Sequence, residues 1–403
     1  MKFAHFADCH IGAFRDIKLR NLNMAAFEKA ASDSLSENVD FILISGDLFN
    51  TSIPSIDSLK RVVKTLKELR KRNTPVYIIA GSHYFSPSGK TMIDVLEEAE
   101  LVVNVVKGNI IDEKLSLNFT IDRKTGAKIT GIIGKRGMLD KKFYQDLDRN
   151  KIEKEFGFKI FMFHTTLSEF KTEEFQKLDS VPISILPKNF DYYAGGHLHF
   201  RKEMAYDKGH IVYPGPLFPA SFREIETLKN GSYCVYDNGK IESRPINIIN
   251  VHSIKINCEG KNPIQVQDEL KKEIKNKEFL NTIVTIRLHG ILESGKTTDI
   301  DWKEIYQILE QKQAYFVARN TDKLVSKEFS DINVEIKSAE EIEENIINEH
   351  IGKLNLKDID EKEFIKDLMQ VLSSEKQEGE KNYDFEKRIL ENLKEYLNKN
   401  ERT

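Results

Sequence analysis

The sequence predicts an α/β fold in which two sheets pack together and helices flank them. Short continuous apolar runs alternate with amphipathic segments over the first hundred residues, a pattern typical of buried parallel strands joined by helices. Further apolar runs later in the chain are separated by proline-containing loops and predict a second sheet. Of the 403 residues, 40% are hydrophobic and 31% are charged, which excludes disordered, collagen-like and disulfide-scaffold proteins.

Charge and cysteine content narrow the class of protein further. The chain has 61 Lys+Arg, 64 Asp+Glu and a net charge of −3, which by itself argues neither for nor against nucleic acid as a partner. Its three cysteines are too few for a disulfide framework and indicate a reducing compartment. Neither an apolar run of membrane-spanning length nor the apolar core of a signal peptide is present, so we expect an intracellular, cytoplasmic (nucleoid-associated) protein without a membrane partner.

The first half of the chain alternates strands and helices. The clearest helix is 55–72, because Val62, Leu66 and Leu69 fall on one face and charged residues lie off it. The elements predicted here are strands at 2–7, 41–44 and 76–80 and helices at 22–38, 55–72 and 91–100. The second sheet is expected from strands at 159–163, 192–194 and 231–236, in the same domain.

The remaining chain divides into two regions. A small α/β unit at 248–337 is predicted from strands at 253–257, 282–288 and 314–319 and helices at 263–275 and 302–312. From 338 the chain is charged and helical, with helices expected at 339–354, 361–373 and 384–397. Residues 338–403 are too few to build a core alone. They form either a solvated helical arm or an apolar stripe that binds a partner, and the sequence leaves both open. The predicted domains are 1–247, 248–337 and 338–403.

Carboxylate and imidazole side chains follow five of the predicted strands. Ligands of open α/β sheets bind outside the carboxyl ends of the strands, so these side chains are expected to converge. Mixed carboxylate and imidazole ligands suit Mn²⁺, Fe²⁺ or Zn²⁺, and two pairs with a central carboxylate can hold the two ions of a phosphoester hydrolase. Any one of these histidines, taken alone, is more often structural. In chain order the residues are Asp8, His10, Asp47, His83, His164, His197 and His199.

These motifs resemble those of the calcineurin-like metallophosphoesterases, whose signature is D-x-H, G-D, G-N-H-[DE], a single H and G-H-x-H. The resemblance is closest to one branch, the nuclease subunit of double-strand-break repair complexes (the bacterial SbcD type and its archaeal and eukaryotic counterparts), because of Ser45–Phe49, Pro54-Ser55 and Phe85–Gly89. It implies a metallophosphoesterase sandwich at 1–247, a DNA-binding capping domain at 248–337 and, at 338–403, a helical region that binds an SMC-like coiled-coil ATPase.

The resemblance also implies the roles of the residues. Asp8, His10 and His199 would hold one ion, Asp47 would bridge, and His164, His197 and the residue at 82 would hold the second. His83 would be catalytic, standing over the scissile phosphate while a metal-activated water attacks. The implied protein is a homodimeric, Mn²⁺-dependent nuclease with two divalent ions, acting as a single-strand endonuclease and/or 3′–5′ exonuclease on broken DNA.

Two departures from the family pattern keep alternatives open. Ser82 replaces the asparagine ligand, and a hydroxyl is the poorer ligand. Tyr84 replaces the acid that orients the catalytic imidazole; its hydroxyl could accept a hydrogen bond from His83 but carries no charge at neutral pH. The alternatives are a catalytically weakened subunit that binds DNA ends, or a phosphodiesterase of the same fold acting on small substrates.

Residues Gly290–Thr297 match the phosphate-loop pattern G-x-x-x-x-G-K-[ST]. A true phosphate loop leads directly into its helix, whereas here Asp299 and Asp301 follow and the helix is expected only at Trp302. We therefore expect a turn and no nucleotide cofactor.

Overall fold

The structure, a computed structural model, describes residues 1–84, 91–135, 139–171 and 179–327, and beyond these only 364, 368, 372–373 and 382–400. The chain divides into two compact units, Met1–Lys327 and Glu328–Thr403. None of the helices described is both long enough and apolar enough to cross a membrane.

The first sheet has six strands in the order β14-β13-β1-β2-β3-β4. Strands β1 to β4 run parallel, and β13 lies antiparallel to β1. Their continuous apolar sequences are buried on both faces, as expected for strands covered on two sides. The bounds are β1 Lys2–Phe6, β2 Phe41–Ser45, β3 Val76–Ile79, β4 Val103–Asn104, β13 Gly231–Asp237 and β14 Lys240–Ile246.

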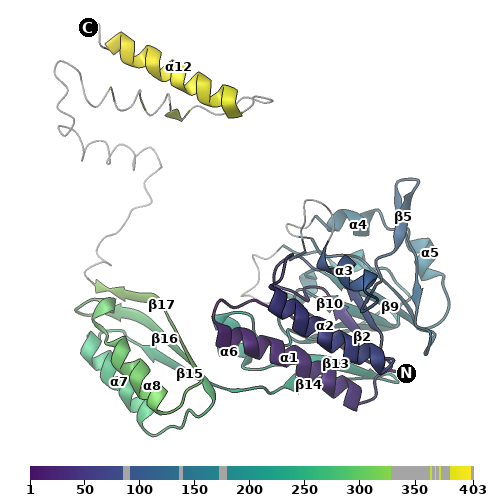
Figure 1. The fold of residues 1–403 in the computed structure, drawn as a ribbon, viewed down its shortest axis with the longest axis horizontal. Helices are drawn as coiled ribbons and strands as arrows, with labels where there is room; N and C mark the ends of the chain where they lie inside the picture. Colours follow the sequence, from purple (N-terminus) through teal and green to yellow (C-terminus); the bar gives the residue numbers. More distant parts are fainter. Residues whose placement is uncertain are drawn as a thin grey trace. The chain divides into compact units, whose positions relative to one another are not determined.

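Helices cover the outer face of this sheet, where α1 and α2 lie side by side (Figure 1). Phe27 of α1 and Leu66 of α2 belong to the same buried cluster as Ile42 and Ile44 of β2. Helix α1 begins earlier than predicted because the Asp16 side chain accepts hydrogen bonds from the first backbone N–H groups. The bounds are α1 Ile17–Ser36, α2 Ile56–Lys71, α3 Met92–Glu98 and α6 Phe222–Leu228.

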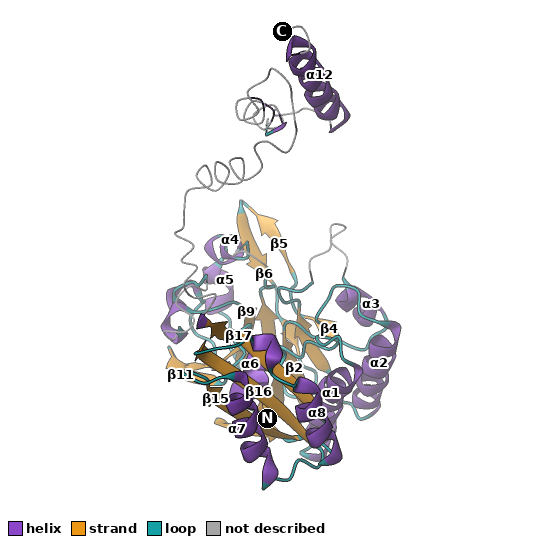
Figure 2. Cartoon of the chain, turned by 90° about the vertical axis from the view of Figure 1, so that its left-hand side faces the viewer, coloured by secondary structure: helices purple, strands orange, loops and turns teal. Residues whose placement is uncertain are grey.

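The second sheet has the strand order β11-β12-β10-β9-β8-β7 and packs face to face with the first. Phe3 and Leu43 of the first sheet share one buried cluster with Met162 and Tyr192 of the second. A hairpin, β5–β6, projects from this sandwich (Figure 2). The bounds are β5 Gly108–Ile111, β6 Lys114–Leu117, β7 Thr120–Ile121, β8 Lys128–Gly131, β9 Lys159–His164, β10 Tyr192–Gly196, β11 Lys202–Tyr206, β12 Gly209–Tyr213, α4 Lys141–Gln145 and α5 Arg149–Glu153, with 3₁₀ turns at Ser168–Phe170 and Ile183–Ile185.

The two-sheet α/β prediction is confirmed, but one strand was assigned to the wrong sheet. Residues 231–236 were expected in the second sheet, whereas β13 pairs with β1 at the heart of the first. A buried strand must satisfy its backbone groups on both edges, and β2 serves only one edge of β1. The chain therefore returns to the first sheet after completing the second.

Residues 250–326 form the small α/β unit, in which β15, β16 and β17 are parallel. Helices α7 and α8 cover one face, where Val266 and Leu309 pack with Ile254 and Ile286. The predicted elements are all present, with the bounds β15 Asn250–Asn257, α7 Pro263–Lys275, β16 Thr282–Leu292, a 3₁₀ turn Thr297–Asp299, α8 Trp302–Gln311 and β17 Phe316–Ser326.

Little of the predicted helical region lies within the described residues. Helix α12 spans Asn382–Asn400 and confirms the helix predicted at 384–397. The helix predicted at 339–354 and most of that at 361–373 lie outside the described residues, as does Phe85–Gly89.

Candidate metal centre

The carboxyl ends of strands from both sheets meet at one edge of the sandwich. Strands β1, β2 and β3 deliver side chains from the first sheet, and β9 and β10 deliver them from the second. Within each of three groups the candidate ligand atoms lie within 4.8 Å of one another. The groups are Asp8, His10 and His199; His10, Asp47 and His83; and Asp8, Asp47 and His164.

Four of these side chains enclose one position for a cation. His10 Nε2 lies 3.0 Å from His199 Nε2 and 4.0 Å from both Asp8 Oδ1 and Asp47 Oδ2. Ligand atoms about 2.1 Å from an ion lie about 3.0 Å apart at right angles and about 4.2 Å apart across it. The spacing and the donor types therefore fit a single divalent ion.

Asp8, Asp47 and His164 offer a second position, because their candidate ligand atoms lie within 4.8 Å of one another. His164 Nε2 is buried 3.1 Å from Asp47 Oδ2, yet it makes no hydrogen bond within the described part of the chain. The other ring nitrogen, Nδ1, donates to the Ser45 carbonyl at 2.9 Å, which leaves the lone pair of Nε2 for a ligand. The donor types of this group also fit a divalent ion.

Backbone strain marks the same residues. Asp8, His10, Asp47 and His197 have φ values of 49°, 43°, 41° and 88°, in the left-handed region that L-residues rarely adopt. Each such residue costs about 1–3 kcal/mol and persists only where its surroundings enforce it. Four strained residues at one edge indicate a functional constraint on this edge.

The sequence profile of the calcineurin-like phosphoesterases matches residues 1–201, a span that holds every predicted site residue. Residues 1–201 belong to the calcineurin-like phosphoesterase family.

Curated relatives extend the similarity. "DNA double-strand break repair protein Mre11" of Archaeoglobus fulgidus is 29% identical over 236 residues, 57% of this chain and 52% of that protein. The chain thus spans about half the length of this relative. The Sulfolobus acidocaldarius protein of the same name is 24% identical over 418 residues, 98% of each chain. "Uncharacterized metallophosphoesterase YhaO" of Bacillus subtilis is 25% identical over 252 residues, 60% of this chain and 59% of that protein.

Two predicted ligands of the phosphoesterase site lie differently from the rest. The ring of His197 is exposed and belongs to none of the three groups, although its centre lies 5.1 Å from that of His164. Its backbone N–H donates to both Asp8 oxygens at 3.0 Å. Ser82 Oγ donates to Asp47 Oδ2 at 3.2 Å, so this hydroxyl contacts the central carboxylate.

Tyr84, which stands at the position of the family's acid, has a partner other than His83. Its buried hydroxyl accepts the backbone N–H of Phe49 at 2.9 Å, so it supports the loop after β2. His83 Nδ1 instead lies 2.7 Å from the backbone carbonyl of Asn50. A backbone dipole therefore orients the imidazole that a carboxylate orients in the family pattern.

Sequence reasoning missed Glu224 of α6. Its Oε1 lies 3.1 Å from His199 Nδ1, the nitrogen that faces away from His10. The S-x-x-E pattern of Ser221 and Glu224 signals a helix start, but nothing local to that pattern reveals the contact with His199.

Burial and neighbouring charges set the protonation of the phosphoesterase site. Burial alone would raise the pKa of Asp47, but the imidazoles of His164 and His10 hold it well below its usual range. Burial, reinforced by His199, lowers the pKa of His10 to about 3. At His164 burial opposes the charged form, but Asp47 outweighs it and raises the pKa to about 9, so a metal ion bound there would displace the proton on Nε2.

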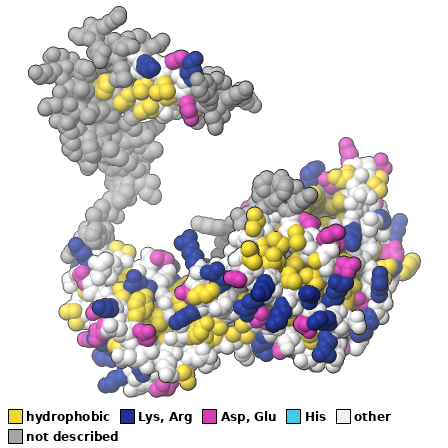
Figure 3. Space-filling view, viewed as in Figure 1, with side chains coloured by type: hydrophobic (Ala, Val, Ile, Leu, Met, Phe, Trp, Pro, Cys, Tyr) yellow, Lys and Arg dark blue, Asp and Glu magenta, His cyan; other side chains and the backbone are white. Residues whose placement is uncertain are grey.

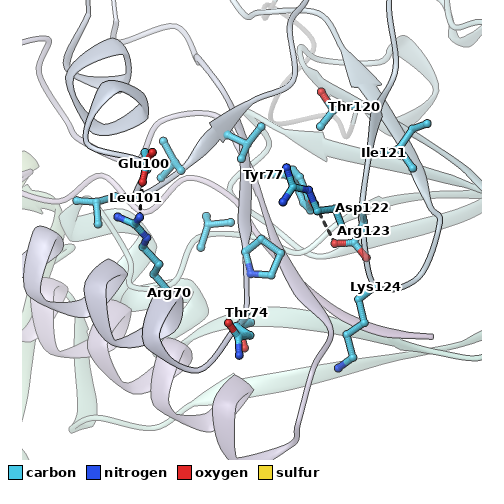
Figure 4. A pocket seen from close by; sticks show the side chains of 15 residues that line it. Arg70, Thr74, Tyr77, Glu100, Leu101, Thr120, Ile121, Asp122, Arg123 and Lys124 are labelled. Carbon is cyan, nitrogen blue, oxygen red and sulfur yellow. Dashed lines mark hydrogen bonds and ion pairs between the residues drawn. The ribbon is translucent and has the colours of Figure 1, made fainter.

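A separate cavity of about 740 Å³ is lined by residues of β3, β4 and β7 (Figure 4). None of the predicted site residues lines it. Inside it, Tyr77 donates to Asp122 at 2.8 Å, and Arg70 pairs with Glu100. This cavity is therefore distinct from the phosphoesterase site.

Proposed function

We propose that this protein is a nuclease that uses two divalent ions to hydrolyse DNA phosphodiester bonds during double-strand-break processing. The observation that carries the proposal is the spacing of His10, His199, Asp8 and Asp47, which fits an ion at the edge where His164 offers a second position. The similarity to archaeal double-strand break repair proteins supports DNA as the substrate.

Asp8, His10 and His199 would hold one ion, and His164 and His197 the other, with Asp47 between them and Ser82 beside it. Bound divalent ions would supply a nucleophilic water at neutral pH and polarise the phosphoryl oxygens. Ligands that contain imidazole and carboxylate but no thiolate suit Mn²⁺, Fe²⁺ or Zn²⁺, and Mn²⁺ is the ion that we propose.

His83 is the proposed catalytic residue. With its Nδ1 proton directed at the Asn50 carbonyl, the protonated ring can donate from Nε2 to a phosphoryl or leaving oxygen. The neutral ring presents a lone pair at Nε2 instead.

We further propose that residues 248–337 contact DNA, that residues 338–403 bind a coiled-coil ATPase, and that the chain is an intracellular homodimer. The Sulfolobus match, which covers 98% of the chain, supports a repair role for the helical region. Removal of residues 338–403 is expected to abolish ATPase binding in a co-purification assay and to preserve metal binding. Unchanged co-purification would contradict this assignment.

A weakened enzyme is the second candidate, because Ser82 Oγ contacts Asp47 and offers no amide oxygen to an ion. The deciding experiment incubates the full chain and the Ser82→Asn variant with Mn²⁺ and single-stranded DNA, double-stranded DNA or bis(p-nitrophenyl) phosphate. DNA cleavage by the unaltered chain supports the nuclease. Cleavage by Ser82→Asn alone supports the weakened enzyme, and cleavage of the small diester alone contradicts a DNA substrate.

A further inference from the structure

Helix α6 touches the metal centre on one side. Glu224 Oε1 lies 3.1 Å from His199 Nδ1. The carboxylate is itself held in place, because Ala220 N donates to Oε2 at 2.8 Å and Ser221 Oγ donates to Oε1 at 3.1 Å. The Glu224 carboxylate is therefore fixed by the start of its own helix while it contacts the histidine.

The same helix is clamped by the small α/β unit on its other side. Arg287 of β16 donates from Nε to Glu226 Oε2 at 2.9 Å, and its Nη2 lies 2.8 Å from the same oxygen. Its guanidinium lies 5.1 Å from the ring centre of Phe222, and Nη1 donates to Asn320 of β17 at 3.0 Å. Lys255 Nζ of β15 lies 3.6 Å from Glu226 Oε1. All three strands of the unit thus take part in the clamp.

The Glu226 side chain is only 3% exposed and that of Arg287 is 21% exposed, so the carboxylate of this ion pair is buried. Removing one partner of such a pair leaves an uncompensated charge and is strongly destabilising. The contact therefore fixes the position of α6 against β16 more firmly than a surface ion pair could.

Helical geometry separates the two contacts. Phe222 and Glu226 are four residues apart and share a face, whereas Glu224 is two residues from each, roughly 200° around the axis. One seven-residue helix therefore presents one face to Arg287 and the opposite face to His199.

We propose that Glu224 is a positioning residue for His199 and that α6 couples the small α/β unit to the metal centre through Glu226 and Arg287. The inference rests on the proposed role of His199 as a metal ligand. By accepting the Nδ1 proton, Glu224 fixes the ring and leaves the Nε2 lone pair for the ion. A movement of β16 relative to the sandwich shifts α6 and changes metal affinity.

The test measures Mn²⁺ affinity of the full chain by electron paramagnetic resonance of free Mn²⁺, without DNA. Glu224→Gln keeps the side-chain shape and the acceptor for Ala220, so the fold is retained and the dissociation constant rises roughly 10-fold. Glu203→Gln is the matched control, because Glu203 pairs with His210 at 3.4 Å outside the site; no change is expected.

The coupling is tested by the double variant Glu226→Gln/Arg287→Met, which removes both charges of the pair together and is expected to unfold at an unchanged temperature. The dissociation constant should rise several-fold, and by less than that when Glu224→Gln is already present, because coupled residues are non-additive. An unchanged constant in Glu224→Gln overturns the positioning role, and an unchanged constant in the double variant overturns the coupling. An unaltered chain that binds no Mn²⁺ overturns the proposed function as well, so the failures are distinguishable.

Discussion

The two-sheet sandwich and the small α/β unit both contain parallel strands joined by helices, but the residues that follow these strands differ between the two regions. In the sandwich, the residues that follow β1 and β2 include buried Asp8 and Asp47 with positive φ. In the small unit, Glu259 after β15 is exposed and accepts the backbone N–H of Ile291 at 2.9 Å. The difference is that strand ends of a second sheet face those of the first only in the sandwich.

The Gly290–Thr297 segment of the small unit matches the phosphate-loop pattern but does not lead into a helix as a phosphate loop does. Gly290 lies within β16, Lys296 N donates to Asp299 Oδ2 at 2.8 Å, and α8 begins only at Trp302. The expected turn is confirmed. A phosphate-binding pattern does not create a site unless the helix N-terminus meets it.

The largest expected effect is on hydrolytic activity, which should depend on the sandwich edge and not on the small unit. Asp47→Asn removes the charge between the two proposed ions and should lower phosphodiester hydrolysis by roughly 10³-fold or more, measured with bis(p-nitrophenyl) phosphate and Mn²⁺. Asp299→Asn in the small unit should leave the rate unchanged. An equal loss of hydrolysis rate in both variants would show that the activity does not depend on the sandwich edge alone.

Crowding at the sandwich edge is tested with two glycines of positive φ. A Cβ at Gly46 (φ +88°) would lie 2.1 Å from His164 Nδ1, whereas one at Gly260 (φ +68°) would meet nothing within 4 Å. We expect Gly46→Ala to lose about 2–5 kcal/mol of unfolding free energy and its metal binding. Gly260→Ala should lose about 1 kcal/mol, from backbone strain alone. Urea denaturation measures the unfolding free energy of both variants. Losses of similar size would show that crowding at Gly46 does not affect stability.

Tyr84→Phe addresses the support of the loop after β2. The change leaves the buried N–H of Phe49 without its acceptor, which should cost about 1–3 kcal/mol of unfolding free energy. Tyr306→Phe is the counterpart in the small unit and should change it by less than about 0.5 kcal/mol. A Tyr84→Phe variant that unfolds at the same temperature as the unaltered chain would show that the hydrogen bond from Phe49 does not stabilise the fold.

The smallest effect is expected at Lys296. Lys296→Ala should alter stability by less than about 0.5 kcal/mol and leave calorimetric titrations with ATP as flat as those of the unaltered chain. Saturable ATP binding that the substitution removes would restore the phosphate-loop interpretation.

Surface charge did not identify a partner from the sequence, and the structure shows why. Lys and Arg side chains gather over α1 and α2 among acidic ones (Figure 3), and several are paired, as Arg61 is with Glu28 at 2.6 Å. The charges that distinguish the protein are the buried carboxylates Asp8 and Asp47, which a net charge cannot reveal.

The sequence by itself determined β1, β2, β3, β9, β10 and β13 of the sandwich, the three strands of the small unit, the principal helices and which side chains gather at the sandwich edge, because apolar periodicity, caps and strand-end motifs are local signals. It did not predict the shorter or more exposed sandwich strands, such as β11 and β14. Their roles as ligands stay predictions. Only the tertiary structure placed β13 beside β1, directed Tyr84 to Phe49, gave His83 the Asn50 carbonyl and brought Glu224 to His199. These partners are 25 to 235 residues apart in sequence. Which of them meet is decided when the two sheets pack and their buried polar groups find hydrogen bonds.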